Sequence, residues 1–300
     1  MTLEVLHQPN EAAGRCEAVR SSGRTLGFVP TMGALHAGHL ELVQRAVAEN
    51  DFACVSVFVN PLQFDDPRDL ERYPRDLEAD ASLLAEAGCD LLFTGTLAGF
   101  FPEAELGPDG APRIDLRDPG PAAVGLEGEH RPGHFAGVAT IVARLFECVR
   151  PSRAYFGEKD FQQTLVVRHL AREMRGSRAE DPRVVVCPTS RTPDGLARSS
   201  RNVRLSPGGR ERALTLSAAL FAARERWRAG ERDQARLEAV LRAELERPGV
   251  EPEYAAVRDP DRFHLVAAGE LDRGRGLVAA RVEGVRLIDT LALDDAENAS

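Results

Sequence analysis

The sequence lacks paired cysteines, a long apolar run and an excess of positive charge. Its cysteines are odd in number and never spaced as CxxC: Cys16, Cys54, Cys89, Cys148 and Cys187. Most of them lie in apolar stretches, so we expect buried free thiols in a reducing compartment. No run approaches the ~18 apolar residues of a membrane span. Residues 1–20 lack the apolar core of a signal peptide, so we expect a cytoplasmic protein.

The net charge of −9 argues against binding to nucleic acid or an anionic membrane, because both need a positive surface field. We therefore expect neither as a partner. Local basic sites for a phosphate-bearing small molecule stay open. With 300 residues, 43% hydrophobic and 28% charged, the chain can bury a real core in one large or two modest domains.

Short apolar runs alternate with helical patterns in the first two thirds of the chain. The predicted strands are 26–29, 52–59, 91–93, 154–156 and 184–187, and the predicted helices are 38–50, 76–87, 136–149 and 161–174. Strands that alternate with helices at this spacing predict an α/β fold, with a parallel sheet and helices on both faces.

The pattern changes near Pro188. A loop at 188–207 is followed by predicted helices at 209–229 and 233–247, and then by strands at 254–258, 276–283 and 285–289. Glu283-Gly284 is typical of a tight turn between the last two strands. We predict a smaller C-terminal α+β domain with a short antiparallel sheet, and a division into 1–187 and 188–300. We expect 291–300 to be frayed.

Four polar segments carry the candidate chemistry, and the first is PTMGALHAGH at 30–39. It follows a strand and opens a helix, where backbone N–H groups and the helix dipole attract phosphate. His36 and His39 could both point at one anion and, in their charged form, donate to oxygens that gain charge as pyrophosphate leaves. Gly38 would let a nucleotide approach closely. The histidines could instead cap the helix or form half of a metal site.

The second segment, FVNPLQF at 58–64, places Asn60 and Gln63 at the end of the next strand. Neutral amides suit a small substrate with hydroxyls and a carboxylate. The alternative is a structured turn around Pro61 that Asn60 caps, and spacing alone favours that alternative.

The third and fourth segments are FGEKDFQQ at 156–163 and DGLARSSRN at 194–202. Lys159 suits phosphate, Asp160 could cap a helix or hold a ribose hydroxyl or Mg²⁺, and Gln163 lies one turn further on. The glycine-containing loop with Arg201 could wrap a triphosphate and close as a lid. A solvated charge cluster and an interdomain linker are the alternatives.

Together these segments resemble the pantothenate synthetase (pantoate–β-alanine ligase) family. The resemblance rests on PTMGALHAGH, FVNPLQF, LEGEHRPGHFAGV, YFGEKDFQQ and DGLARSSRN in that order, with RLID near the end. HxGH alone would indicate only the wider nucleotidyltransferase superfamily. The resemblance implies a Rossmann-like domain with a smaller C-terminal domain, usually as a homodimer. It also implies that ATP with Mg²⁺ activates pantoate as an adenylate, which β-alanine then converts to pantothenate.

The resemblance also implies residue roles. His39 would be a proton donor, His36 its phosphate-binding partner and Lys159 a phosphate contact, while Gln63 and Gln163 would hold pantoate. The implied ATP site comprises Met32, Gly33, Ala34, Leu35, His36, Ala37, Gly38, His39, Gly157, Glu158, Lys159, Asp160, Ser190, Arg198, Ser199, Ser200 and Arg201. No protein ligand of a metal is assigned. Glu127, Arg131 and His134 are expected as neighbours of the site without specific roles.

Four features depart from the family pattern, and one is Phe93-Thr-Gly-Thr96 in place of the more usual Ala-Pro-Ser run after the third strand. Arg198 stands where Met or Leu is usual, Ser190 where an apolar residue is usual, and Thr192 where an acid is common. Arg198 and Ser190 bear on the adenine pocket and on closure of the lid, so we expect an atypical ATP affinity. Two other functions stay open, namely another adenylyl-transferring enzyme of the superfamily and a nucleotide-binding paralogue without turnover.

Overall fold

A computed structural model describes residues 2–108, 110–175, 182–263 and 269–294. The chain forms two compact units. The first is Met1–Gly157 with Gln162–Cys187, and the second is Glu158–Phe161 with Pro188–Ser300. The second unit thus includes four residues that the predicted division at 187 placed in the first domain.

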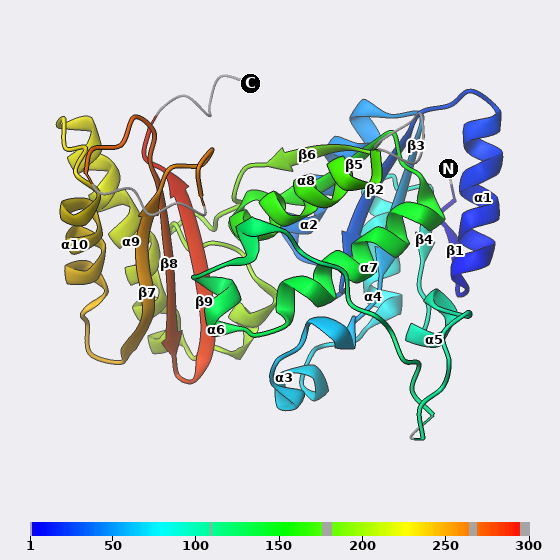
Figure 1. Ribbon diagram of the computed structural model, residues 1–300, viewed down its shortest axis with the longest axis horizontal. Coiled ribbons are helices and arrows are strands. Elements are labelled where there is room, and N and C mark those ends of the chain that lie inside the picture. The colour runs from blue at the N-terminus through cyan, green and yellow to red at the C-terminus, as the bar shows by residue number, and fades with distance from the viewer. Residues whose placement is uncertain (1, 109, 176–181, 264–268, 295–300) are drawn as a thin grey trace. The chain divides into compact units, whose positions relative to one another are not determined.

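The first unit contains a parallel six-stranded sheet in the order β1-β4-β3-β2-β5-β6 (Figure 1). The strands are β1 Glu4–Leu6, β2 Leu26–Thr31, β3 Phe52–Val57, β4 Leu91–Phe93, β5 Arg153–Gly157 and β6 Arg183–Cys187. The last five were predicted, although β3 ends two residues early. β1 was missed because its sequence Glu4-Val5-Leu6 begins with a charged residue, whereas the equally short β4 is entirely apolar. Its edge position comes from pairing with β4.

Helices cover both faces of this sheet, as predicted (Figure 1). α1 Pro9–Ser21, α7 His134–Val149 and α8 Phe161–Arg175 share a core with Phe28 and Cys54. α2 Ala37–Glu49 and α4 Leu77–Glu86 share the opposite core with Val29 and Val55. Consecutive strand residues therefore face opposite helical layers, as the period of two requires. α1 was not predicted.

Shorter helical segments complete the chain. They are η1 Pro61–Gln63, α3 Pro67–Glu71, α5 Leu97–Phe100, η2 Pro121–Ala123, α6 Glu127–His130, η3 Glu158–Asp160 and η4 Ser200–Arg204. Among the residues that the structure describes, no helix is both long and apolar enough to cross a membrane.

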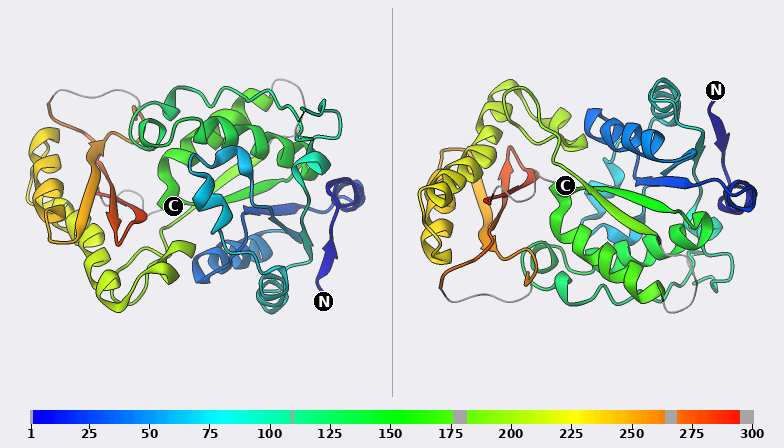
Figure 2. Two further views of the ribbon diagram at one scale, coloured as in Figure 1. Left: turned by 90° about the horizontal axis from the view of Figure 1, so that it is seen from below. Right: turned by 90° about the horizontal axis from the view of Figure 1, so that it is seen from above.

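The second unit packs two helices on a three-stranded antiparallel sheet. α9 Pro207–Arg228 and α10 Gln234–Leu245 share a core with β7 Val250–Arg258, β8 Arg275–Val282 and β9 Val285–Ala292. Figure 2 shows both helices on one side of this sheet. Glu283 and Gly284 join β8 to β9 with φ of 53° and 73°, so the predicted tight turn is confirmed.

Two predictions for this unit were wrong in extent. β7 begins at Val250, four residues before the predicted start, because an irregularity between Pro252 and Tyr254 interrupts the alternation. The expected fraying from residue 291 is contradicted by β9, which continues to Ala292, and by Leu293, which is fully buried. Residues 295–300 of that prediction lie outside the described part of the chain.

Candidate functional site

His36 and His39 stand together at the start of α2, directly beyond the carboxyl end of β2. Their rings are stacked with centroids 4.0 Å apart, and both side chains are half-buried. The backbone N–H of His36 donates to Nδ1 of His39 at 3.4 Å. Nδ1 accepts in this contact, which places a ring proton on Nε2. The pair therefore contributes to the cap of α2.

Gln63 lies at the carboxyl end of the neighbouring strand β3, and Asn60 holds its amide. Asn60 is 1% exposed, its Oδ1 accepts from Leu62 N–H at 3.2 Å, and its Nδ2 donates to Gln63 Oε1 at 2.9 Å and to the Gly137 carbonyl at 3.2 Å. Asn60 therefore caps the turn around Pro61, which was one of its two predicted roles. With its amide engaged in this way, Asn60 orients the side chain of Gln63.

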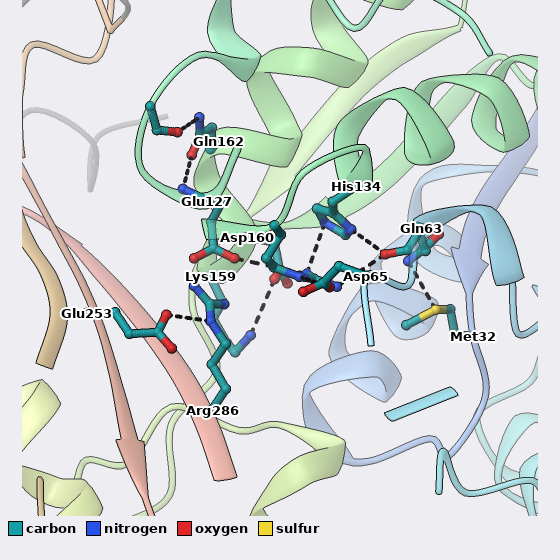
Figure 3. A network of polar contacts seen from close by, with 12 residues as sticks. Met32, Gln63, Asp65, Glu127, His134, Lys159, Asp160, Gln162, Glu253 and Arg286 are labelled. Carbon is teal, nitrogen blue, oxygen red and sulfur yellow. Dashed lines mark hydrogen bonds and ion pairs between the residues drawn. The ribbon is translucent and has the colours of Figure 1, made fainter. Parts of the chain in front are cut away.

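The other end of the Gln63 amide points to the first polar segment (Figure 3). Its Nε2 lies 3.1 Å from Sδ of Met32, which follows β2. β2 and β3 are parallel neighbours with Thr31 paired to Val57, so both segments leave the sheet at the same edge. The structure thus brings Met32 and Gln63 together.

Arg131 and His134 hold the main chain of Gln63, and Figure 3 shows His134 beside Gln63. The Gln63 carbonyl lies 2.8 Å from Nδ1 of His134 and accepts from Nη2 of Arg131 at 3.2 Å. His134 Nδ1 must donate in this contact. Arg131 also donates from Nε to Asp65 at 3.1 Å, and its Nη1 is 4.0 Å from the Glu127 carboxylate. These residues, for which the sequence indicated no role, position Gln63.

The two glutamines at 162 and 163 differ in environment. Gln162 is 2% exposed, accepts from Glu127 N–H at 3.0 Å and donates to the Ala122 carbonyl at 2.8 Å, so it is structural. Gln163 is half-buried and stays the candidate for substrate binding.

In the second unit, Lys159 follows β5 by two residues, and its Nζ lies 3.4 Å from Oδ1 of Asp160. The preceding Glu158 accepts from Nη2 of Arg275 at 2.8 Å, and Arg275 is fully buried with its guanidinium over the ring of Phe161. This ion pair fixes the backbone on which Lys159 stands. No local pattern could indicate this ion pair, because Arg275 lies 117 positions from Glu158.

The glycine-containing loop is anchored at its base. Arg191 donates to both carboxylate oxygens of Asp289, at 2.7 and 2.9 Å. Burial raises the pKa of Asp289, and the Arg191 pair opposes that rise. Beyond this anchor, Ser199 accepts from Arg201 N–H at 3.3 Å and caps η4. Four consecutive side chains of this loop are half-buried, namely those of Arg198, Ser199, Ser200 and Arg201.

A cavity of about 230 Å³ opens at the carboxyl ends of β2, β3 and β4. It is lined by Met32, Gly33, Val57, Phe58, Val59, Pro74, Arg75, Asp76, Leu77, Asp80, Thr94 and Gly95. Sequence reasoning missed Asp80, a carboxylate that is 3% exposed. The helical pattern at 76–87 could have indicated it. Asp80 lies four positions before the buried Leu84, so a charged residue stands on the apolar face of that helix.

Within the described ranges, no group of three or more His, Cys, Asp or Glu side chains could hold a metal ion. Mg²⁺ differs from zinc in keeping several waters and binding through substrate phosphates with one or two carboxylates. The 46% exposed Asp160 carboxylate beside Lys159 suits that manner of binding.

Comparisons with known proteins agree over nearly the whole chain. The family model for pantoate–β-alanine ligase matches residues 4–292. A curated relative from Brucella canis, named pantothenate synthetase, is 44% identical over 98% of this chain and 97% of its own length. The pantothenate synthetase structure from Thermus thermophilus is 44% identical with a TM-score of 0.84, over 97% of this chain and 99% of that one.

A structure of pantoate–β-alanine ligase from Francisella tularensis, complexed with β-γ ATP and β-alanine, is 30% identical with a TM-score of 0.75. It covers 97% of this chain and 98% of that one. Fold, motif order and identity point the same way, and the chain belongs to the pantoate–β-alanine ligase family.

Proposed function

We propose that this chain carries out the ligation of its family, in which ATP drives the condensation of pantoate with β-alanine to give pantothenate, AMP and pyrophosphate. The observation that carries the proposal is the contact between Gln63 and Met32. It joins a neutral amide suited to a hydroxy acid to the segment that bears His36 and His39. A carboxylate and a nucleotide would then meet at one edge of the sheet.

In the first step, a pantoate carboxylate oxygen attacks the α-phosphorus of ATP, the bond to the β-phosphate bridging oxygen breaks, and pyrophosphate leaves. The nucleophile is already an anion, so the protein contributes position and charge stabilisation. We assign that role to Nε2–H of His39, with His36 beside it. We assign phosphate binding in the second unit to Lys159, Ser199, Ser200 and Arg201.

In the second step, the neutral amine of β-alanine attacks the acyl carbon of pantoyl adenylate. The C–O bond to AMP breaks, and the amine loses a proton as the amide forms. We assign Gln63 and Gln163 to pantoate, whose hydroxyls and carboxylate need both donors and acceptors. Asn60, Arg131 and His134 hold Gln63 in place.

We propose that the carboxylate of Asp160 would hold the Mg²⁺ that accompanies ATP. The ion neutralises phosphate charge when bound. We also propose a homodimer in the cytoplasm. Sedimentation equilibrium should give about twice the chain mass of 32.6 kDa.

The proposal is tested by AMP release from ATP and Mg²⁺, with pantoate and β-alanine each omitted in turn. Both acids should be required for steady turnover, while pantoate alone should support exchange of pyrophosphate into ATP. His39→Ala should lower the turnover number about 100- to 1,000-fold, because a transition-state donor is lost. Exchange driven by an amino acid but not by pantoate would reject the proposed substrate.

A further inference from the structure

The backbone between β2 and the two histidines takes an unusual path. Gly33 has φ of 82° and Ala34 has φ of 51°, so two successive residues occupy the left-handed region. Glycine does so readily, but for alanine the conformation costs about 1–2 kcal/mol. Some other contact must hold this turn, which sets where α2 and its histidines begin.

That contact is the carboxylate of Asp80 on α4. Its Oδ2 accepts from the backbone N–H of Ala34 at 3.0 Å, and its Oδ1 accepts from the backbone N–H of Leu35 at 2.7 Å. One carboxylate thus engages two consecutive N–H groups immediately before His36. These two groups are occupied, so the phosphate-binding role predicted for this segment falls to the residues after them.

The approach depends on Gly33. A Cβ at that position would lie 2.9 Å from Oδ2 of Asp80 and 2.9 Å from Cγ1 of Val57. Glycine here permits the left-handed turn and also makes room for the carboxylate.

We propose that Asp80 is a positioning residue for the ligation. Its carboxylate holds the Gly33–Leu35 turn and thereby places His36 and His39 against the nucleotide. The inference rests on the proposed function, because it assigns Asp80 an effect on catalysis through those histidines.

Replacement by asparagine separates this role from simple stabilisation. The amide oxygen can accept from one N–H, but the amide NH₂ then faces the other donor. Burial raises the pKa of Asp80 and Asp76 adds to that rise, while the N–H groups of Leu35 and Ala34 lower it. Burial of the charge therefore opposes folding at neutral pH, and a neutral side chain removes that cost. Asp80→Asn should therefore lower kcat clearly while it changes the melting temperature little.

The experiment measures pantoate-dependent pyrophosphate exchange and melting temperature for the wild type, Asp80→Asn and Asp51→Asn. We expect Asp80→Asn to lower kcat about 10- to 100-fold with a change in the pantoate KM below about 3-fold, because misplacement of a transition-state donor acts on kcat. Asp51 is a matched control that directly precedes β3, at the amino-terminal ends of the strands. Its carboxylate accepts from Thr25 N–H at 2.9 Å. Asp51→Asn should keep wild-type kinetics.

Two further variants test the route of the effect. In a His39→Ala background, Asp80→Asn should cost less than about 3-fold, since residues that act as a unit are not additive. The loss of kcat caused by Asp80→Asn should be at least about 5-fold smaller in an Ala34→Gly background than in the wild type. Glycine adopts the left-handed turn without help from the carboxylate.

A wild-type kcat for Asp80→Asn, or full additivity with His39→Ala, would overturn the positioning role. If Asp80→Asn does not fold, Asp80→Glu, which keeps the charge but displaces it by a methylene, takes its place with the same criteria. Failure of the wild type to use pantoate would instead count against the proposed function.

Discussion

At the scale of single residues, the side chains of the candidate site also build local structure. Nδ1 of His39 accepts from the backbone N–H of His36 at 3.4 Å, so the same ring helps to cap α2. Asn60 caps a turn and holds Gln63. These residues contribute both to the candidate chemistry and to local structure. Few substitutions should be tolerated there, because a change that spares the chemistry would still alter the backbone that positions it.

Nothing in the structure explains the departure at Ser190, whereas the departure at Thr192 has a local explanation. Ser190 accepts from the N–H of Arg198 through its carbonyl at 2.9 Å, which any residue could do. Thr192 donates from its hydroxyl to the Leu196 carbonyl at 3.2 Å and so helps to close the turn at the loop base. The altered ATP affinity stays a prediction.

Tyr155 fastens the far end of α2. Its hydroxyl donates to Glu49 at 2.9 Å and accepts from Asn50 at 2.7 Å, and burial raises its pKa from 10.0 to about 12. The unfolded chain releases this proton first, so stability should be intact below pH 10 and fall as the pH rises towards 12. Urea unfolding should show this loss in the wild type and a smaller loss in Tyr155→Phe. Equal slopes in the two proteins would contradict the assignment.

At the scale of elements, α7 supports the turn that carries Gln63. A Cβ at Gly137 in α7 would lie 2.0 Å from the Leu62 carbonyl oxygen and 2.8 Å from the Gln63 nitrogen. Both are backbone atoms, so the turn would have to move. Gly137→Ala should therefore destabilise the protein by about 1–3 kcal/mol and raise the pantoate KM.

Thermal unfolding and initial rates would check this prediction. Gly14 in α1 is the matched control, since nothing lies within 4 Å of an added Cβ there. Gly14→Ala should stabilise by about 0.5–1 kcal/mol and leave the rates unchanged. Gly137→Ala with unaltered kinetics would mean that Gln63 does not depend on α7.

At the scale of the whole molecule, the cysteines are distributed as buried apolar side chains. Cys16, Cys54, Cys89 and Cys187 are buried and Cys148 is half-buried. Burial raises the pKa of Cys89 to about 12 and also raises the pKa values of Cys54, Cys148 and Cys187. An aromatic disulfide reagent at pH 8 should leave most thiols of the native protein unmodified, because the thiolate is the reactive form.

In denaturant, the same reagent should titrate all five cysteines. In the native protein, Cys148 should react first, since it is the most exposed, and peptide mapping would identify it. Fast stoichiometric labelling of Cys54 or Cys89 would show that the core opens readily.

The amino-acid sequence alone was sufficient for the fold class, the family and the four segments that carry chemistry. Strand and helix periods depend on residues a few positions apart, and turn residues such as Gly284 act on their own backbone, so this information is local. The same reasoning placed His36, His39 and Gln63 after successive strands of a parallel sheet.

Tertiary structure alone decided which residues hold those side chains. Asp80 contacts the N–H of Ala34 across 46 positions, and His134 contacts Gln63 across 71. Such pairs leave no periodic trace in the sequence. Their geometry exists only once α4 and α7 have packed, because hydrogen bonds between distant segments depend on backbone positions that the hydrophobic cores impose.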